Sequence, residues 1–197
     1  MEIGRTMDYT ETIRSIGGHT VPPVGTWELD VPNTFATFIA PHLVLARVKG
    51  RIPGITGSFT VTDDPSNSHL EVELDARTLT TDDEKRDQHL TSEDFIHVAR
   101  FPTIWFASTA LHPVDDLWKL TGDLTIRGET NPVTLDVRFL GLTSDWGRLK
   151  SRFHAETVID RHQWGMTWNR PLDWGGVAVG REVRLEIHAQ AKLAEEA

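Results

Sequence analysis

Residues 80–109 read T-T-D-D-E-K-R-D-Q-H-L-T-S-E-D-F-I-H-V-A-R-F-P-T-I-W-F-A-S-T, and this stretch decides the fold. A polar cluster of Arg86, Asp87 and His89 lies in it between two strand patterns. Apolar residues occupy alternate positions in residues 70–76 before the cluster and in residues 104–109 after it, the period of a strand with one dry face. A connection of this length is usually functional or disordered. Because it carries apolar anchors, we predict a folded helical lid over one end of a β-structure; the anchors are Leu79, Leu90, Phe95, Ile96 and Phe101.

The two-residue period recurs along the rest of the chain. Turn-forming residues separate the segments, for example at residues 63–67 and 128–131. Helical character is expected only in the lid and in one short turn near Pro41. The pattern predicts about eight antiparallel strands, each with one apolar face. The further strand segments are residues 27–31, 35–40, 48–52, 55–61, 118–126, 133–139, 149–157 and 183–193.

An all-β chain of this kind forms a sandwich or a closed barrel. We favour the barrel, because no edge-protecting Lys or Pro pattern marks the long strands. A barrel of about eight strands is just wide enough to be filled by side chains or to hold one small ligand. Residues 1–25 are rich in turn formers towards their end and are predicted to form an N-terminal arm, with the barrel domain at residues 26–197.

Composition excludes several classes of function. The formal charge of −9 argues against binding nucleic acid through phosphates and against attachment to an anionic membrane surface. No apolar run reaches the length of a membrane span, so stable membrane insertion is not expected. The chain has no cysteine, which excludes disulfides and thiolate chemistry. The N-terminus lacks the apolar core of a secretory signal, and we expect a cytoplasmic protein.

Two blocks of sequence and one shorter motif resemble a known family. Residues 81–106 follow the pattern T-x-x-x-x-R-D-x-H-L-x-S-x-D-F-(x)-P-x-I-x-F, and residues 122–133 read G-D-L-T-I-R-G-E-T-N-P-V against G-x-L-T-I-x-G-x-T-x-P-V. Arg161, Trp164 and Gly165 match R-x-x-(aromatic)-G. From residue 26 to residue 193 the chain resembles the YceI-like family of lipocalin-like, polyisoprenoid-binding proteins. The residues that match the first pattern are Thr81, Arg86, Asp87, His89, Leu90, Ser92, Asp94, Phe95, Pro102, Ile104 and Phe106.

The resemblance implies a lipocalin-like barrel whose hollow interior takes an isoprenoid chain, with the polar head near the mouth. It also makes a homodimer plausible. Two departures stand out. Asn33 and Thr34 occupy the place where the family often carries a His-Ser pair, and many members begin with a secretory leader and are periplasmic.

The predicted polar mouth consists of Arg86, Asp87, His89 and Arg161. In one interpretation Arg86 or His89 meets the head group, because a guanidinium presents a fork of donors to phosphate oxygens. In the other, Asp87 caps a short helical turn while Arg86 and His89 pair within the lid. Arg161 either serves a head group or pairs with an acidic neighbour.

The predicted apolar lining comes from the inward strand faces, the lid and the tryptophan-rich segment. Large rings, including Phe139, nearly fill such a barrel if all point inward, so the sequence leaves open whether it is hollow. Trp146, Trp164, Trp168 and Trp174 either cover a barrel end or subunit contact, or border the cavity. The predicted lining is Phe35, Ile39, Phe59, Leu74, Leu90, Phe95, Ile104, Phe106, Trp118, Leu120, Leu135, Phe153, Trp164 and Trp168.

We expect no enzyme, cofactor or metal site. The sequence has no G-x-S-x-G elbow, no phosphate-binding loop, and nine histidines without the spacing of a helical zinc site. The predicted function is binding, transport or sequestration of a long apolar ligand: a polyisoprenoid lipid, an isoprenoid quinone or a similar amphiphile. One alternative is a small enzyme acting in the same cavity with His89 and Asp87 as acid and base. The other is an interaction module with a filled barrel.

Overall fold

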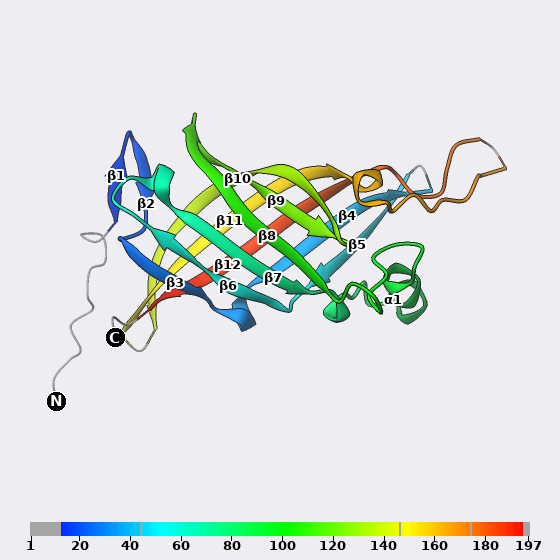
Figure 1. Ribbon diagram of the computed structural model, residues 1–197, viewed down its shortest axis with the longest axis horizontal. Coiled ribbons are helices and arrows are strands. Elements are labelled where there is room, and N and C mark those ends of the chain that lie inside the picture. Colours follow the sequence, from blue (N-terminus) through cyan, green and yellow to red (C-terminus); the bar gives the residue numbers. More distant parts are fainter. Residues whose placement is uncertain (1–12, 44, 146, 174, 195–197) are drawn as a thin grey trace.

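The computed structural model describes residues 13–43, 45–145, 147–173 and 175–194, and within them almost every element is a strand (Figure 1). The sheet is antiparallel throughout, as the predicted fold class requires, and the described residues contain one α-helix, α1 (Glu84–Thr91). The strands are β1 (Arg14–Ile16), β2 (His19–Val21), β3 (Gly25–Leu29), β4 (Phe35–His42), β5 (Ala46–Ile52), β6 (Ile55–Val61), β7 (His69–Asp75), β8 (Thr103–Val114), β9 (Leu117–Ile126), β10 (Glu129–Asp145), β11 (Arg148–Asp160) and β12 (Glu182–Leu193).

The barrel closes because β11 pairs with both β10 and β12. Ten strands take part, but β3 and β4 form one broken strand, since both pair with β12 on either side of the 3₁₀ turn η2 (Val31–Asn33). β5 and β6 form another, interrupted at residues 53–54. The wall is therefore an eight-stranded barrel, which confirms the predicted number and the choice of a barrel over a sandwich.

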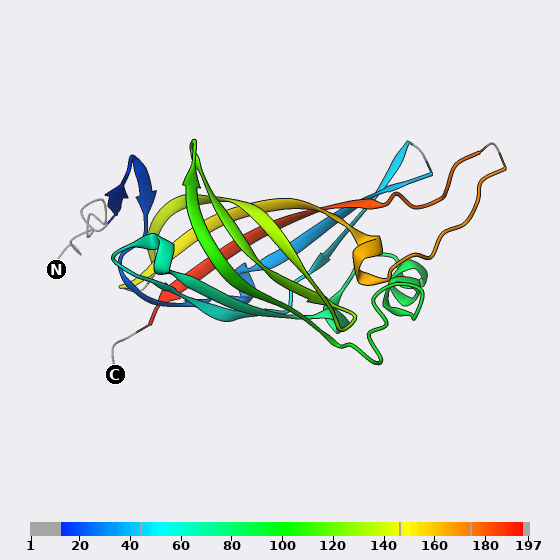
Figure 2. The ribbon, with the colours of Figure 1, turned by 45° about the horizontal axis from the view of Figure 1, so that its top comes forward.

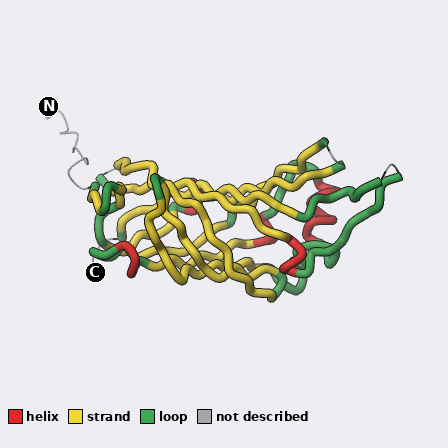
Figure 3. Tube along the Cα trace, turned by 90° about the horizontal axis from the view of Figure 1, so that it is seen from above, coloured by secondary structure: helices red, strands yellow, loops and turns green. Residues whose placement is uncertain are grey.

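The two ends of the barrel carry different elements (Figures 2 and 3). At one end lie α1, the 3₁₀ turns η4 (Ala76–Thr78) and η5 (Arg161–Trp164), and residues 165–173 and 175–181; we call this the lid end. At the other lies the small β1–β2 hairpin, beside the start of β3 and the end of β12, where Trp27 pairs with Leu193. We call this the arm end.

The helical lid is confirmed, but the helical turn near Pro41 is wrong. Pro41 lies within β4 opposite Arg47, and its carbonyl accepts a hydrogen bond from the backbone N–H of Gly180. Leu43, with φ of 48°, turns the chain back into β5. Pro41 lies beyond Phe35–Ile39, the part of β4 that pairs with β12, so its missing N–H costs no ladder bond on that side and strand pairing prevails over the helical preference. No helix among the described residues is long and apolar enough to span a membrane.

Candidate functional site

The barrel encloses a cavity of about 280 Å³ along its axis. Apolar side chains from the inner face line almost all of it, and its polar contributors are threonines, Ser68 and His69. No Lys, Arg, Asp or Glu lines it among the residues that the structure describes. The volume lies near the lower limit of the roughly 300–1,000 Å³ typical of ligand pockets. The interior is therefore hollow and dry, not filled by its own rings.

The large rings leave this space because they lie against the wall. The Phe59 ring packs edge-on against Phe153 with centroids 5.3 Å apart, and Phe139 lies 5.3 Å from the same ring. The Phe106 ring lies over Gly122, where a Cβ would overlap it. Glycine in a strand thus gives an aromatic ring room to lie flat on the backbone. The sequence alone did not decide whether the barrel is hollow. These ring contacts explain why free volume remains inside it.

Eight of the predicted lining residues line the cavity, and six do not. Leu90, Phe95, Trp164 and Trp168 lie at the lid end, outside the lining. Trp146 and Trp174 lie outside the described residues. The lining residues that were predicted are Phe59, Leu74, Ile104, Phe106, Trp118, Leu120, Leu135 and Phe153.

The inward placement of Phe35 and Ile39 is wrong. The η2 turn shifts the phase of β4 by one residue, so Ala36 and Phe38 face the cavity instead. Phe35 stacks on the outward His188 ring at 5.0 Å, and Ile39 pairs with Arg184. Phe35 and Ile39 on one face of β4, and Ala36 and Phe38 on the other, are all apolar, so the alternation alone did not decide which face points inward.

The prediction omitted further lining residues. Most of them lie on strand faces that the two-residue period had predicted to be apolar. Residues contributed by the arm carried no such signal. The omitted residues include Val21, Pro22, Leu29, Ala36, Phe38, Ile52, Ile55, Val61, Val72, Leu124, Ile126, Val133, Val137, Ala155, Leu185, Ile187 and Ala189.

The polar lid residues bind one another. Asp87 accepts hydrogen bonds from the Thr81 N–H at 2.8 Å, from the Thr81 hydroxyl and from the Thr80 hydroxyl at 2.9 Å. Arg86 donates to the Thr81 hydroxyl and carbonyl. Burial raises the pKa of Asp87, but the hydrogen bonds from Thr81 and Thr80 outweigh it, so the pKa lies below its usual value. Asp83, not Asp87, caps α1, since it accepts from the backbone N–H of Arg86.

His89 and Arg161 also find their partners at the lid end. His89 Nε2 lies 3.0 Å from Asp94 Oδ2, and its ring packs edge-on against Trp168 at 4.4 Å. Arg161 is 2% exposed and donates to the carbonyls of Gly180 and Met166, so it organises the following loop. Its predicted acidic partner is absent from these contacts. None of the four predicted mouth residues lines the cavity, so the geometry gives their role as ligand contacts no support.

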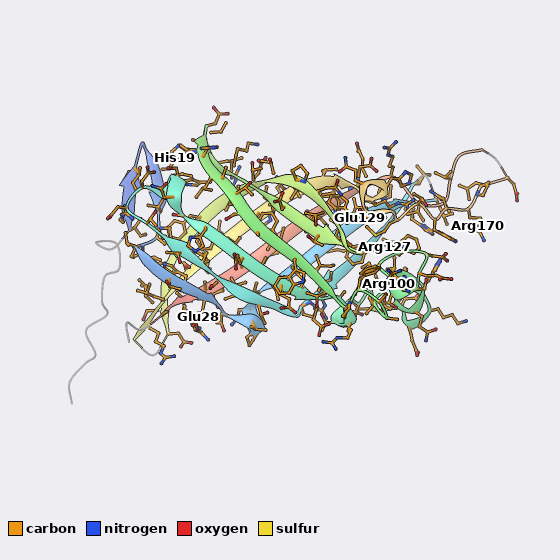
Figure 4. All side chains as sticks on the ribbon, viewed as in Figure 1. His19, Glu28, Arg100, Arg127, Glu129 and Arg170 are labelled. Carbon is orange, nitrogen blue, oxygen red and sulfur yellow. The ribbon has the colours of Figure 1, made fainter. Side chains whose placement is uncertain are left out.

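The lid end is closed by a packed plug. Trp164 is fully buried, and its indole N–H donates to the Leu124 carbonyl at 3.0 Å. Leu79 and Met166 are buried in the same cluster, and none of these three plug residues lines the cavity. Arg127, labelled at this end in Figure 4, donates to the Glu93 carbonyl and ties the lid to the β9–β10 turn.

At the arm end the cavity reaches the N-terminal hairpin. Thr20, Val21 and Pro22 belong to its lining, together with Ser68 and His69. Val21 is buried at 5% exposure, so this part of the arm packs against the barrel. Within the described residues, no group of three or more His, Cys, Asp or Glu side chains is placed to hold a metal ion.

Comparisons with known proteins agree with this architecture. The sequence model of the YceI-like domain matches residues 27–191. Protein YceI of Salmonella newport (strain SL254) is 33% identical over 137 residues, which cover 68% of this chain and 72% of that protein.

Two solved structures share the fold. The crystal structure of Burkholderia cenocepacia BcnA superposes with a TM-score of 0.70 at 16% identity, covering 82% of this chain and 98% of that one. A polyisoprenoid binding domain from Saccharophagus degradans, implicated in plant cell wall breakdown, superposes with a TM-score of 0.61 at 11% identity, covering 87% and 99%.

Proposed function

The chain belongs to the YceI-like domain family, and from that premise we propose that it binds a long apolar molecule inside its barrel and carries or sequesters it without chemical change. The ligand class is a polyisoprenoid lipid, an isoprenoid quinone or a similar amphiphile. The observation that carries this proposal is the apolar cavity along the barrel axis. The name of the Saccharophagus degradans domain, which has the same fold, supports the isoprenoid class.

Apolar burial supplies the affinity in this proposal. Each methylene that a guest transfers from water into the cavity contributes about 0.8 kcal/mol. A chain of a few isoprene units therefore binds with few polar contacts, and the length of the cavity selects the length of the guest.

The lining also favours a neutral guest. Threonine hydroxyls, Ser68 and His69 offer hydrogen bonds, whereas no charged side chain lines the cavity among the described residues. An unpaired charge in an apolar site costs far more than a hydrogen-bonded hydroxyl or carbonyl. We therefore propose that an alcohol or quinone head is held inside the barrel and that a phosphate is held outside it.

The positions of His89 and Asp87 do not support the alternative of an enzyme acting in the cavity. His89 and Asp87 lie outside the cavity lining, and their polar atoms are occupied by Asp94 and by Thr80 and Thr81. A substrate in the cavity would not meet either group, and general acid–base catalysis requires hydrogen-bond reach.

Extraction of the protein followed by mass spectrometry tests the proposal. The purified protein is extracted with organic solvent, and a delipidated sample is incubated separately with a prenyl alcohol, a prenyl phosphate and a quinone. We expect a co-purified isoprenoid or stoichiometric uptake of the alcohol and quinone, with weaker uptake of the phosphate. Recovery of no lipid together with no uptake of any added compound would contradict the proposal.

A further inference from the structure

The two ends of the cavity differ in how firmly they are closed. At the lid end the buried Trp164, Leu79 and Met166 fill the barrel, and α1 is held by the Asp87 and Arg86 hydrogen bonds. Opening this end would unpack part of the core, which protein interiors resist. A ligand therefore enters the cavity more easily at the arm end than at the lid end.

At the arm end, the described part of the chain contributes a small hairpin to the closure of the cavity. β1 and β2 are three residues each and pair only with one another. A two-stranded hairpin alone is at best marginally stable in water, so its position depends on what it touches. Figure 4 labels His19 on this hairpin, beside the barrel end remote from α1.

Three side chains hold the hairpin to the barrel. Arg14 donates to the Thr62 carbonyl at 3.1 Å and to the Asp63 carbonyl at 2.6 Å. The Asp63 carboxylate is 99% exposed, so its ion pair with Arg14 at 3.8 Å adds little. On the opposite side the His19 ring packs against Trp118 with centroids 5.3 Å apart, and Val21 projects into the cavity lining.

The chain behind the hairpin is firmly anchored. Trp27 is fully buried and donates its indole N–H to the Pro23 carbonyl at 3.2 Å. Between the hairpin and this anchor, Val24 is 46% exposed and Gly25 has φ of 139°. A movement of residues 14–22 can pivot at the exposed Val24; among the described contacts it breaks those of Arg14 and His19 and withdraws Thr20, Val21 and Pro22 from the cavity lining.

We infer that residues 14–22 form a movable stopper over the mouth of the barrel, which swings aside to admit the ligand and sets the chain length that the closed cavity accepts. This inference rests on the proposed function. It places the head group of the ligand at the arm end, beside Thr20, Ser68 and His69, and not at the lid. The stopper precedes residues 27–191, the part of the chain that the family model matches.

A covalent tether tests the inference, because the chain has no cysteine of its own. Arg14→Cys with Asp63→Cys, joined by a bis-maleimide cross-linker, fastens the hairpin to the β6–β7 turn. Glu93→Cys with Arg127→Cys, joined in the same way, fastens the lid to the β9–β10 turn as the matched control. Retinol serves as the apolar probe, and its uptake and release are followed by stopped-flow fluorescence, with circular dichroism to verify folding.

We expect the arm tether to slow both uptake and release by at least about tenfold, as expected when a closing element limits exchange. The same double variant without the cross-linker lacks the Arg14 hydrogen bonds and exchanges retinol about fivefold faster than the wild type. The lid tether leaves both rates within about twofold of the wild type.

Two results would overturn the inference, and they are distinguishable. If the wild type binds retinol and the arm tether leaves its rates unchanged, or the lid tether alone slows them, the stopper is excluded while the carrier function stands. If neither retinol nor the prenyl alcohol or quinone binds the wild type, the proposed function fails and the stopper fails with it.

Discussion

Asp87 fastens the lid through hydrogen bonds from a single segment, residues 80–81. The Thr81 backbone N–H donates to the Asp87 carboxylate, and this donor is buried, since Thr81 is 8% exposed. Removing the carboxylate leaves that N–H without its acceptor, and an unsatisfied buried donor costs about 1–3 kcal/mol. The hydrogen bonds within this polar cluster therefore give it a structural role in holding the lid, without any contact to a head group.

We predict that Asp87→Ala lowers the free energy of unfolding by about 2 kcal/mol, because Thr80 and Thr81 lose their common acceptor. Urea unfolding followed by tryptophan fluorescence measures the change. Lys85→Ala, exposed on the same helix, is the matched control and stays within about 0.5 kcal/mol of the wild type. Retinol affinity stays unchanged in both variants; a selective loss of affinity in Asp87→Ala would assign this carboxylate to the ligand.

Asp30 makes stability depend on pH. It is 4% exposed and receives Lys192 at 2.8 Å, Lys150 at 3.3 Å and the Asn33 amide at 3.0 Å. Burial raises the pKa of Asp30, but the hydrogen bonds from Lys192, Asn33 and Lys150 outweigh it and hold the pKa below 3.8. A lowered pKa in the folded state stabilises the protein above pH 3.8, and this stability is lost as the pH falls through the folded value.

We predict that Asp30→Asn is less stable than the wild type by about 1–3 kcal/mol at pH 7, because Lys192 loses its charged acceptor and Lys150 keeps only Asp145. The difference narrows as the pH falls below 3.8, where the wild-type carboxylate becomes protonated. Unfolding curves of both proteins between pH 7 and about pH 3 measure it. A difference that stays constant over this range would show that the charge of Asp30 does not contribute.

At the scale of the strand, two glycines determine where aromatic rings lie. The Phe106 ring covers Gly122 on the neighbouring strand, and the Phe38 ring covers Gly50. A side chain at either glycine would push the ring towards the lumen. The glycine that begins the block G-D-L-T-I-R-G-E-T therefore helps keep the cavity open as well as the strand pair close.

We predict that Gly122→Ala destabilises the protein by about 1–3 kcal/mol and weakens retinol binding, because the new methyl overlaps the Phe106 ring and the Ala107 carbonyl. Thermal unfolding and a fluorescence titration measure the two effects. Asp123→Ala, on the exposed face of the same strand, is the control and changes neither. Stability lost with affinity intact would mean that the ring yields outwards.

The strands and the lid were predictable because each follows from a local pattern. Alternation located β7 to β12, and a polar stretch with apolar anchors located α1. Which face of β4 points inward was not predictable, since both faces of this strand carry large apolar residues. The cavity-facing arm was not either, because Thr20 and Val21 acquire their role only from the barrel that they cover.

For the whole molecule, the pairing of β11 with β12 turns a row of half-buried strands into a container. Closure removes the edges of the sheet, and the apolar inner faces of the strands then face one another across the barrel. Whether they meet in the middle depends on ring orientations around the wall, such as those of Phe59, Phe139 and Phe153. A sequence pattern predicts the face of the strand on which a ring lies, but not whether the ring lies flat against the wall. The cavity could therefore be recognised only from the three-dimensional structure.

We therefore predict that one large side chain in the lumen weakens ligand binding while the barrel persists. Ala155 lines the cavity from β11, between Val137 on β10 and Ile187 on β12. In Ala155→Trp the indole occupies volume that a guest needs. Displacing about two methylenes costs the guest roughly 1.6 kcal/mol, which weakens binding by at least about tenfold.

His154→Trp is the matched control, because the neighbouring position faces outward beside His188 and adds the same ring to the outer surface. Retinol titration and mass spectrometry of extracted lipid compare the two variants, and circular dichroism verifies that both fold. A cost of about 1–3 kcal/mol in stability is expected for Ala155→Trp if the ring is strained, and less if the void accommodates it. Equal retinol affinity in a folded Ala155→Trp variant would show that the guest binds elsewhere, because the same space cannot hold both.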